Sequence, residues 1–394
     1  MIRCDALIVG GGPAGSTCAR ALHQAGWHVI VMDRARFPRD KVCAGWVTPG
    51  VFRLLELDPA EYRATGLTIQ TITGFRTSVM GDPAIETRYG RTISYAIRRC
   101  EFDTFLLNRS RADLLQETPL ESLERRGDEW IANGDITARV VVGAGGHFCP
   151  VARTISKVGS PSDPTSSAGW AIRFRGSPPA RPVVAKEAEF SIDGDDSDAD
   201  GELPELFFCR DLEGYGWCVR KGAHLNIGLG RREHGDLNPH IDDFKTFLER
   251  TGLARRASLV KWRGHAYLAS GTGARPLIAD GVLVAGDAAG LAYPESGEGI
   301  KPAVESGRLA AETLIAARGR TGIEDLKPYE AELRRRYPPA PPTPAALAGL
   351  TKALGRLLMR SPLFTRRVVV DRWFLRNTKH EEREGYEGLF LKSK

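Results

Sequence analysis

Two glycine-rich segments near opposite ends of the 394-residue chain carry the residues best suited to bind a phosphate-bearing ligand. The first follows the apolar run 6–9 and contains Gly10, Gly12, Pro13, Ala14 and Gly15. Glycines at these spacings permit a tight turn, a close approach of the backbone to a pyrophosphate and close packing of a helix on a strand. Free N–H groups at the start of such a helix also attract phosphate.

An acidic residue stands at the distance that a nucleotide site requires. A helix-like stretch reaches residue 25, a second apolar run covers 29–32, and Asp33 and Arg34 follow. Asp33 comes 18 residues after Gly15, near the spacing at which a carboxylate accepts hydrogen bonds from a ribose. The alternative is an ordinary turn in which the glycines serve packing alone, but that alternative does not explain the position of Asp33. The order strand, turn, helix, strand and acid therefore predicts a dinucleotide site.

The second segment indicates which dinucleotide to expect. The apolar run 282–285 ends at Gly286 and Asp287, and a turn of small residues leads through Gly297 and Gly299 to a helix near Ile300. Asp287 is placed to hydrogen-bond a ribityl chain. The turn backbone would meet the pyrimidine ring of a flavin, where the positive end of the helix stabilises negative charge. An enzyme that uses NAD alone needs no such segment, so the chain is predicted to bind FAD.

Four blocks of the sequence carry a resemblance to a known family. They are Gly10 to Gly15 with Asp33 and Arg34, then residues 37–45, residues 99–103 and residues 286–300. Together they resemble flavoproteins of the p-hydroxybenzoate hydroxylase fold and, within it, the geranylgeranyl reductase-like FAD-dependent oxidoreductases. The resemblance implies an α/β (α+β) fold, with a Rossmann-like FAD-binding domain, an interposed antiparallel β-sheet substrate domain and C-terminal helices.

The same resemblance divides the chain into discontinuous domains. The FAD-binding domain is expected over residues 1–66, 90–158 and 272–330, and the substrate domain over residues 67–89 and 159–271. Strand-like alternation between residues 187 and 229 agrees with an antiparallel sheet in the middle of the chain. A C-terminal helical region is expected over residues 331–394.

Position by position, the resemblance implies that FAD is contacted by residues from all four blocks: Ala14, Asp33, Cys43, Ala44, Arg99, Asp287, Gly299 and Ile300. It implies that Cys43 lies close to the isoalloxazine and that Arg99 supplies positive charge to the cofactor. Two plainer interpretations stay open, in which Cys43 is a small buried hydrophobe and Arg99 is a solvated surface charge.

Residues 214–220 resemble the aromatic substrate strand of geranylgeranyl reductases, except that Val219 and Arg220 stand where a Phe-Pro pair is expected. Tyr215 and Trp217 are two residues apart, so their side chains point to one face of a strand and are predicted to bind substrate over the flavin. An ordinary aromatic core face is the alternative. The resemblance implies a small apolar or prenyl-like substrate, and the altered pair leaves a different substrate open.

Three activities remain open. In the first, reduced FAD passes a hydride to a carbon–carbon double bond and an acid supplies the proton, with Cys43, Tyr215 and Glu298 as candidate catalytic acids. In the second, a monooxygenase uses reduced FAD and O2 to hydroxylate or epoxidise a substrate. Gly145 stands where hydroxylases of this fold carry an acid, and this difference counts against the monooxygenase.

The third activity is that of a carrier or sensor without turnover. It is disfavoured because a complete flavin site beside a cavity is rarely kept for binding alone. The electron source would be NAD(P)H or an external reductase, which makes an electron-donor protein a candidate partner.

Composition agrees with a sizeable enzyme, since 42% of the residues are hydrophobic and 26% are charged. No stretch approaches the ~18 uninterrupted apolar residues that span a bilayer. The first strand is expected almost at Met1, which leaves no space for a signal peptide and favours a cytoplasmic location. Seven cysteines form no Cys-x-x-Cys pair, so neither a disulfide framework nor a metal site is expected.

The C-terminal region differs in charge from the rest. Residues 331–394 hold 14 Lys and Arg against 6 Asp and Glu, a net charge of +8. Leucines recur there at helical spacing, at 347, 350, 354, 357 and 358, among basic residues. The segment is predicted either to pack on the flavin domain or to make peripheral contact with an anionic membrane surface. No aromatic residues interleave with the basic residues at 352, 356 and 360, so nucleic acid is not an expected partner.

Overall fold

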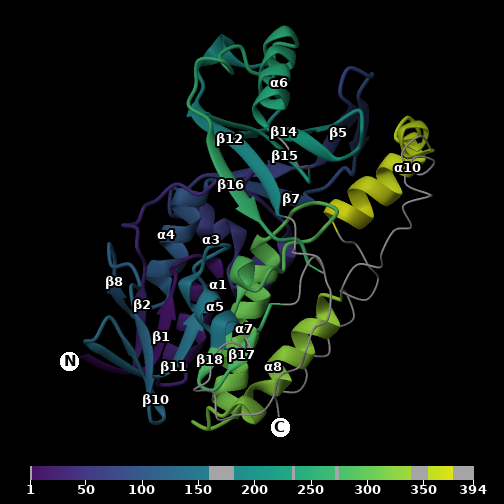
Figure 1. Cartoon of the computed structure of the whole chain (residues 1–394). Coiled ribbons are helices and arrows are strands. Elements are labelled where there is room, and N and C mark those ends of the chain that lie inside the picture. The colour runs from purple at the N-terminus through teal and green to yellow at the C-terminus, as the bar shows by residue number, and fades with distance from the viewer. Residues whose placement is uncertain (1, 159–181, 233–235, 271–274, 339–353, 376–394) are drawn as a thin grey trace.

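Two large sheets organise the described part of the chain. The computed structural model describes residues 2–158, 182–232, 236–270, 275–338 and 354–375. Within these residues lie an eight-stranded sheet, a seven-stranded sheet and a small three-stranded sheet. Figure 1 shows the eight-stranded sheet in the lower half of the molecule and the seven-stranded sheet in the upper half.

The eight-stranded sheet has β1 near its centre. Its order is β17–β18–β11–β1–β2–β8, and β10 and β9 extend it from β11. The neighbours from β18 to β8 run parallel. Parallel strands end at one edge of a sheet, so the loops that follow β1, β2, β11 and β18 meet there. The strands are β1 Ile2–Val9, β2 Val29–Met32, β8 Asp113–Leu115, β9 Leu123–Arg126, β10 Glu129–Ala132, β11 Ile136–Gly143, β17 Ile278–Ala279 and β18 Val282–Val284.

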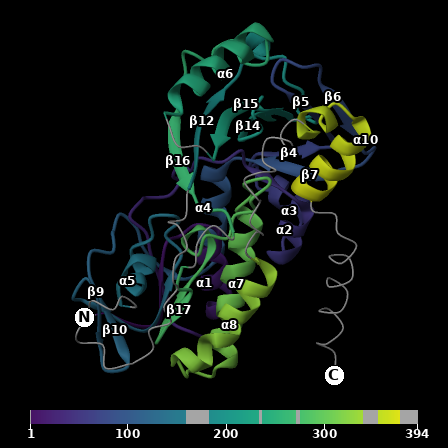
Figure 2. The ribbon, with the colours of Figure 1, turned by 45° about the vertical axis from the view of Figure 1, so that its right-hand side comes forward.

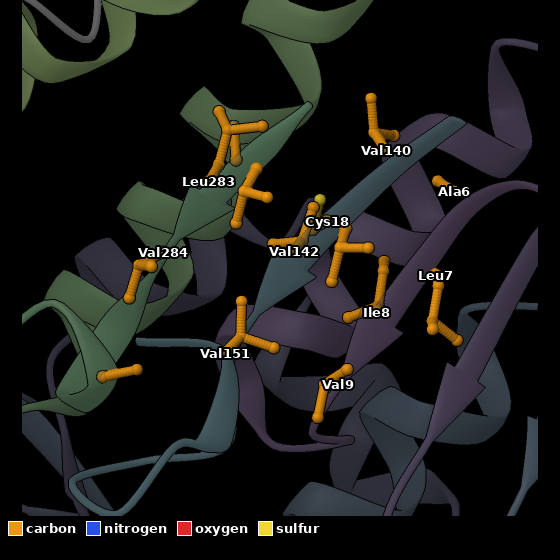
Figure 3. Packing of buried hydrophobic residues seen from close by; sticks show 14 of the residues in the cluster. Ala6, Leu7, Ile8, Val9, Cys18, Val140, Val142, Val151, Leu283 and Val284 are labelled. Atoms are coloured by element: carbon orange, nitrogen blue, oxygen red, sulfur yellow. The ribbon is translucent and has the colours of Figure 1, made fainter. Parts of the chain in front are cut away.

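The apolar side chains on both faces of this sheet are buried. Leu7 and Ile8 in β1, Val140 and Val142 in β11, and Leu283 in β18 are fully buried in one cluster, which Figure 3 shows from close by. A parallel strand with helices on both faces is expected to be apolar throughout rather than alternating. This explains why these strands read as continuous apolar runs in the sequence.

Two helices that pack on this sheet cross each other at close range. They are α1 Pro13–Gln24 and α7 Ile300–Ala316. A Cβ on Gly307 would lie 2.1 Å from the carbonyl oxygen of Ala14, and one on Gly286 would lie 3.1 Å from the Cβ of Ala14. The missing side chains therefore let the C-terminal segment reach the first turn of α1. The other helices of this half are α2 Pro49–Leu54, α3 Pro59–Ala64, α4 Arg99–Arg109, α5 Pro150–Val158 and α8 Ile323–Arg336.

The seven-stranded sheet has the order β16–β12–β15–β14–β13–β5–β6. All neighbours in it are antiparallel except β13 and β5, which are parallel. The expected antiparallel sheet thus contains one parallel pair, because β5 comes from a distant part of the chain and no hairpin links it to β13. The strands are β5 Gly74–Val79, β6 Ile85–Arg88, β12 Val183–Ser191, β13 Glu205–Phe208, β14 Gly214–Lys221, β15 His224–Arg231 and β16 Arg263–Tyr267.

A three-stranded antiparallel sheet contains part of the segment that was assigned to the substrate sheet. Its order is β3–β7–β4, with bounds Trp46–Val47, Ser94–Ile97 and Ile69–Ile72. Of residues 67–89, only β5 and β6 join the seven-stranded sheet, whereas β4 pairs with β7. The segment therefore divides between two sheets.

The two faces of the seven-stranded sheet differ in what covers them. Helix α6, Asn238–Arg250, covers the outer face, where Phe244 and Leu248 pack with Phe207 and Ile227. Figure 1 shows α6 above the sheet, away from the eight-stranded sheet. The inner face carries a different cluster that includes Phe208, Trp217 and Val219, because neighbouring residues in a strand point to opposite faces.

Residues 354–375 pack against the inner part of this sheet. Here α10 Pro362–Phe364 continues into the π-helix η4 Thr365–Phe374, and Figure 2 shows α10 beside β5 and β6. Val369, Val370 and Phe374 are buried in the cluster that contains Trp217. Leu347 and Leu350 lie outside the described residues. Among the described residues, no helix combines the length and apolar character needed to cross a membrane.

Helix α8 runs across residue 331, where the C-terminal region was expected to begin. Its late residue Leu333 and the following Tyr337 are buried in the core of the eight-stranded sheet. Burial of these two side chains ties the helix to the half of the molecule that contains the eight-stranded sheet. The change in composition that marks the basic C-terminal region therefore does not coincide with a structural boundary.

Replacing Gly307 with alanine should destabilise the protein by roughly 1–3 kcal/mol, although alanine favours a helix by about 1 kcal/mol over glycine. The added methyl group would collide with the backbone of α1. Thermal unfolding followed by circular dichroism measures the effect. Gly194→Ala is the control, because a Cβ there meets no atom within 4 Å. An unchanged transition in Gly307→Ala would contradict the close helix crossing.

Candidate active site

A cavity of about 1040 Å³ lies between the loop edge of the eight-stranded sheet and the inner face of the seven-stranded sheet. It brings together segments that are far apart in the sequence. Of the site residues predicted above, only Gly15 is not part of its wall. The others that line it are Gly10, Gly12, Pro13, Ala14, Asp33, Arg34, Cys43, Ala44, Arg99, Tyr215, Trp217, Gly286, Asp287, Gly297, Glu298, Gly299 and Ile300.

The turn between β1 and α1 is shaped to hold an anion. Gly10 has a φ of +114°, and Gly12 precedes α1 without any side chain capping the helix. A Cβ on Gly12 would meet only the guanidinium of Arg39, at 3.3 Å. One on Gly15 would lie 1.9 Å from the carbonyl oxygen of Gly10, so Gly15 is needed for packing. Open space, uncapped N–H groups and an arginine together fit the pyrophosphate of FAD.

Asp33 lies at the end of β2, beside this turn. Its Oδ2 accepts a hydrogen bond from the Gly11 N–H at 2.8 Å, and its Oδ1 accepts one from the Ala35 N–H at 2.9 Å. These bonds fix the carboxylate, and each oxygen keeps a lone pair for a ribose hydroxyl. The position suits the role predicted for Asp33.

Asp287 belongs to a half-buried cluster that also contains Lys41 and His265. Lys41 Nζ lies 2.7 Å from His265 Nε2, and these two nitrogens lie 3.7 and 3.8 Å from Asp287 Oδ2. Asp287 is in the short helix η2, Gly286–Ala288, Lys41 follows α1 and β2 in the chain, and His265 is in β16. The cluster therefore joins the two large sheets at the cavity.

Burial and neighbouring charges set the protonation states in this cluster. Burial by itself would raise the pKa of Asp287, but the neighbouring imidazole of His265 and the charge of Lys41 hold that pKa well below its usual range. Burial lowers the pKa of Lys41 and of His265, and Asp287 opposes both shifts. Asp287 is therefore a carboxylate at neutral pH, which is the form that accepts hydrogen bonds from ribityl hydroxyl groups.

The start of α7 faces the cavity. Gly299, which precedes the helix, has no side chain to cap it, and Ile300 is its first, buried residue. At this end the Lys301 N–H donates a hydrogen bond to Glu298 Oε1. Gly297 has a φ of +67°, and a Cβ there would lie 2.2 Å from the hydroxyl oxygen of Tyr267. The positive end of the helix thus meets the cavity through exposed backbone, as the predicted contact with the flavin ring requires.

Arg99 is buried, with 7% of its surface exposed, so the solvated-charge interpretation is wrong. Its Nε and Nη2 donate to the two oxygens of Asp103, at 2.8 and 2.9 Å. Burial alone would lower the pKa of Arg99, but Asp103 and Cys43 outweigh it and raise that pKa. Arg39 lies 3.3 Å from the same Asp103. The two arginines carry two positive charges and Asp103 carries one negative charge, so the cavity wall keeps a net positive charge.

Tyr215 and Trp217 serve both the cavity and the core. Both line the cavity, and Trp217 is buried in the inner-face cluster. The Trp217 indole donates to Asn226 Oδ1 at 2.7 Å and covers Gly228, where a Cβ would lie 2.2 Å from the ring. The hydroxyl of Tyr215 donates to the carbonyl of Ser296. The two interpretations offered for these aromatic residues are therefore compatible.

The three predicted catalytic acids all have hydrogen-bond partners. The Gly45 N–H donates to Cys43 Sγ at 3.3 Å. The proton of the Tyr215 hydroxyl is directed to Ser296, and burial raises the pKa of Tyr215 well above its usual value. Glu298 Oε1 accepts from the backbone of Lys301 at 3.2 Å. All three line the cavity, so each remains a candidate.

Four polar residues of the cavity region were not predicted from the sequence. Lys41 lies inside the block 37–45, but its pairing with His265 had no signal in the sequence. Asn226 and Glu187 come from two strands of the alternating stretch 187–229. A usable signal existed for Glu187, because it shares a strand face with Glu189 and two carboxylates on a strand face that points to the interior are unusual.

Comparison with known proteins agrees with this site. Residues 5–98 match the family model described as FAD dependent oxidoreductase. A digeranylgeranylglycerophospholipid reductase from Methanothrix thermoacetophila is 30% identical over 357 residues, which cover 84% of this chain and 83% of that protein. The chain therefore belongs to the geranylgeranyl reductase-like family of FAD-dependent oxidoreductases, and FAD is its cofactor.

Solved structures share the fold at lower sequence identity. A geranylgeranyl bacteriochlorophyll reductase-like protein from Thermoplasma acidophilum has a TM-score of 0.68 at 18% identity, covering 100% of this chain and 98% of that one. PqsL from P. aeruginosa, in complex with 2-aminobenzoylacetate, has a TM-score of 0.64 at 18% identity and covers 92% of this chain and 98% of its own. These similarities support the fold.

Gly12→Val should weaken FAD binding at least about tenfold while the protein still folds, because the new side chain would enter open space that the pyrophosphate needs. FAD content per purified protein and titration of the stripped protein with FAD measure the change. Gly15→Val is the contrasting variant and should fail to fold, since its Cβ would clash with Gly10. A Gly12→Val protein with full FAD content would contradict the pyrophosphate assignment.

Proposed function

We propose that this FAD-dependent oxidoreductase reduces carbon–carbon double bonds of a prenyl-like lipid. The observation that carries the proposal is the contrast between the two walls of the cavity. One wall holds the glycine segments that suit FAD, and the other holds apolar and aromatic residues such as Phe208, Tyr215 and Trp217. An isoprenoid chain matches such a wall better than a polar substrate does. The name of the digeranylgeranylglycerophospholipid reductase relative supports the same substrate class.

Each wall would have a separate task in the reaction. When bound along the glycine segments, reduced FAD would supply a hydride to one carbon of the double bond. Trp217, held by Asn226, would orient the substrate chain, and Met359 and Phe364 at the cavity wall would help to exclude water. The second carbon then needs a proton from an acid of the cavity, for which Cys43, Tyr215 and Glu298 are the sequence-based candidates.

The electrons that reduce FAD would come from NAD(P)H or from an external reductase. Gly145 follows β11 and lines the cavity, where hydroxylases of this fold carry an acid. This replacement favours an electron-donor protein over a hydroxylase-type NADPH site. Loss of the flavin absorbance after addition of NADH, NADPH or a reduced ferredoxin under anaerobic conditions compares the donors directly.

The substrate class can be tested with enzyme that has been reduced by dithionite without oxygen. Mixing it with a digeranylgeranylglycerophospholipid should reoxidise the flavin and add two hydrogen atoms to the lipid for each reduced bond, as measured by mass spectrometry. A lipid that gains oxygen when O2 is admitted would favour the monooxygenase alternative. Reoxidation by neither the lipid nor lipid with O2 would contradict the proposal.

We further propose that residues 354–375 make peripheral contact with an anionic membrane, from which the lipid would be taken up. The inner side of this segment lines the cavity through Gly355, Met359, Phe364 and Trp373. Its outer side exposes 52% of Leu354, 65% of Leu357 and 59% of Leu363, together with the exposed arginines 356, 366 and 367. Exposed leucines beside basic residues suit an anionic lipid surface.

Replacing Leu354, Leu357 and Leu363 together with serine should reduce binding to phosphatidylglycerol vesicles by at least roughly tenfold. The three side chains would no longer insert into the apolar part of the bilayer. Co-sedimentation measures binding, and phosphatidylcholine vesicles test the electrostatic contribution. Leu259→Ser is the control, because Leu259 is 82% exposed and lies away from this segment. Equal vesicle binding by the triple variant and the wild type would contradict the membrane contact.

A further inference from the structure

Glu187 is a buried carboxyl group at the wall of the cavity that has no role in the site described above. It lies in the middle of β12, and 6% of its surface is exposed. It lines the cavity, and its Oε2 has no hydrogen-bond partner. Burying a carboxylate oxygen without a partner is costly, whereas a neutral carboxylic acid tolerates such a position.

Two basic residues in the strands around Glu187, Arg263 and Lys221, are each already paired with another carboxylate. In β15 the residue opposite Glu187 is Gly228, and in β16 it is Arg263, whose guanidinium is directed to Asp40 instead. The cation whose charge acts on Glu187 is Lys221 in β14, and its Nζ donates to Glu189 Oε2 at 2.6 Å. The cation that could ionise Glu187 is therefore already used by its neighbour.

Glu189 shows what full pairing does to a carboxylate on the same strand face. Besides Lys221, it accepts a hydrogen bond from Arg98 at 3.1 Å and one from Asn226 at 3.3 Å. Burial alone would raise the pKa of Glu189, but Lys221 and Arg98 lower it. Two carboxyl groups with opposite environments side by side are the arrangement that separates an acid from a permanent anion.

The protonation state of Glu187 follows from the same neighbours. Burial raises the pKa of Glu187 to about 7, with Glu189 adding to the rise. The charge of Lys221 and the nearby polar groups of the Cys43 backbone and the Asn226 side chain oppose the rise only in part. An appreciable fraction of Glu187 therefore carries a proton at neutral pH, as a general acid requires.

We propose that Glu187 is the general acid of the reaction, and that it protonates the substrate carbon that does not receive the hydride. This inference rests on the proposed double-bond reduction. In the step, the Glu187 O–H bond and the π bond of the substrate break, and the π electron pair forms a C–H bond to the released proton. The other carbon gains a hydride with its electron pair, which reduced FAD would supply. Glu187 becomes a carboxylate and regains a proton from solvent. Rotation about the terminal side-chain torsion of glutamate, which is soft, would turn the O–H toward the substrate.

Position favours Glu187 over the acids named from the sequence. Trp217 and Glu187 lie on either side of Gly228 in the sheet register, so a substrate chain that packs on the Trp217 indole would pass beside Glu187. The Tyr215 proton is held by the Ser296 carbonyl, and Glu298 lies on the loop before α7, at the flavin wall. Glu187 alone among the four belongs to the apolar wall and carries an unpartnered oxygen in the described structure.

Activity of three variants tests the role. Glu187→Gln should lower kcat about 100-fold or more, because the amide cannot protonate carbon, whereas Glu187→Asp should restore part of the rate. In the wild type, the rate should fall as pH rises through about 7, where Glu187 loses its proton, and Glu187→Gln should lack this dependence. Glu205→Gln is the control, because Glu205 is also buried and its pKa is also raised by burial, but it lies on the outer face and pairs with Arg76.

Thermal unfolding of each variant without substrate gives an independent readout. A raised pKa means that the folded wild type is stabilised by the proton below about 4.5 and loses that stabilisation as pH rises through about 7. The melting temperature of Glu187→Gln should therefore rise relative to the wild type across this pH range. A constant difference would overturn the idea that Glu187 is a proton-bearing acid.

The outcomes separate this inference from the proposed function. An active wild type with an equally active Glu187→Gln variant would overturn only the role of Glu187. A wild type that leaves every lipid double bond intact would overturn the double-bond reduction and the acid role together. Two results in D2O would establish the step. The wild type would reduce the lipid and place deuterium on the carbon that does not receive the hydride, and the Glu187→Gln variant would not reduce the lipid.

Discussion

The close crossing of α1 and α7 is the constraint on which the rest of the site depends. Gly307 lets α7 approach the backbone of Ala14, and Gly286 lets the end of β18 approach the same residue. Without this contact the second glycine segment would not reach the first, although both lie at the loop edge of one sheet. Steric fit of backbone against backbone, rather than a hydrogen bond or an ion pair, thus brings the two parts of the FAD site together.

The cavity that results has walls of different chemistry, and its carboxyl groups differ accordingly. Asp287 stands beside Lys41 and His265 and is ionised, which suits an acceptor for cofactor hydroxyl groups. Glu187 stands on the apolar wall, where the available lysine pairs with Glu189. Environment, not residue type, separates an anion that binds from an acid that can react. The same distinction explains why counting acids in the sequence could not identify the proton donor.

The C-terminal segment connects the cavity to the exterior. Residues 354–375 line the cavity on one side and present leucine and arginine side chains on the other. An amphipathic helix usually buries one face in its own protein and leaves the other polar. Here three large leucines remain exposed beside basic residues, although the inner side is already packed. Packing on the flavin domain and contact with a lipid surface were the two alternatives predicted from the sequence. The described residues 354–375 pack on the seven-stranded sheet instead, and this packing leaves the leucines exposed.

The cofactor could be predicted from the residues alone, because each of the two FAD segments carries a local signal. Gly10, Gly12 and Asp33 in the first segment, and Asp287 and Gly299 in the second, act through backbone turns and strand ends whose geometry depends on neighbouring residues. Pairing across distant strands decided the rest. His265 meets Lys41 and Asp287, and Glu187 lies between Gly228 and Arg263, only through the register of β12, β15 and β16. The parallel pairing of β5 with β13 and the burial of Leu333 in the core are likewise long-range results. Short-range spacing does not encode such contacts, since each depends on where another part of the chain packs.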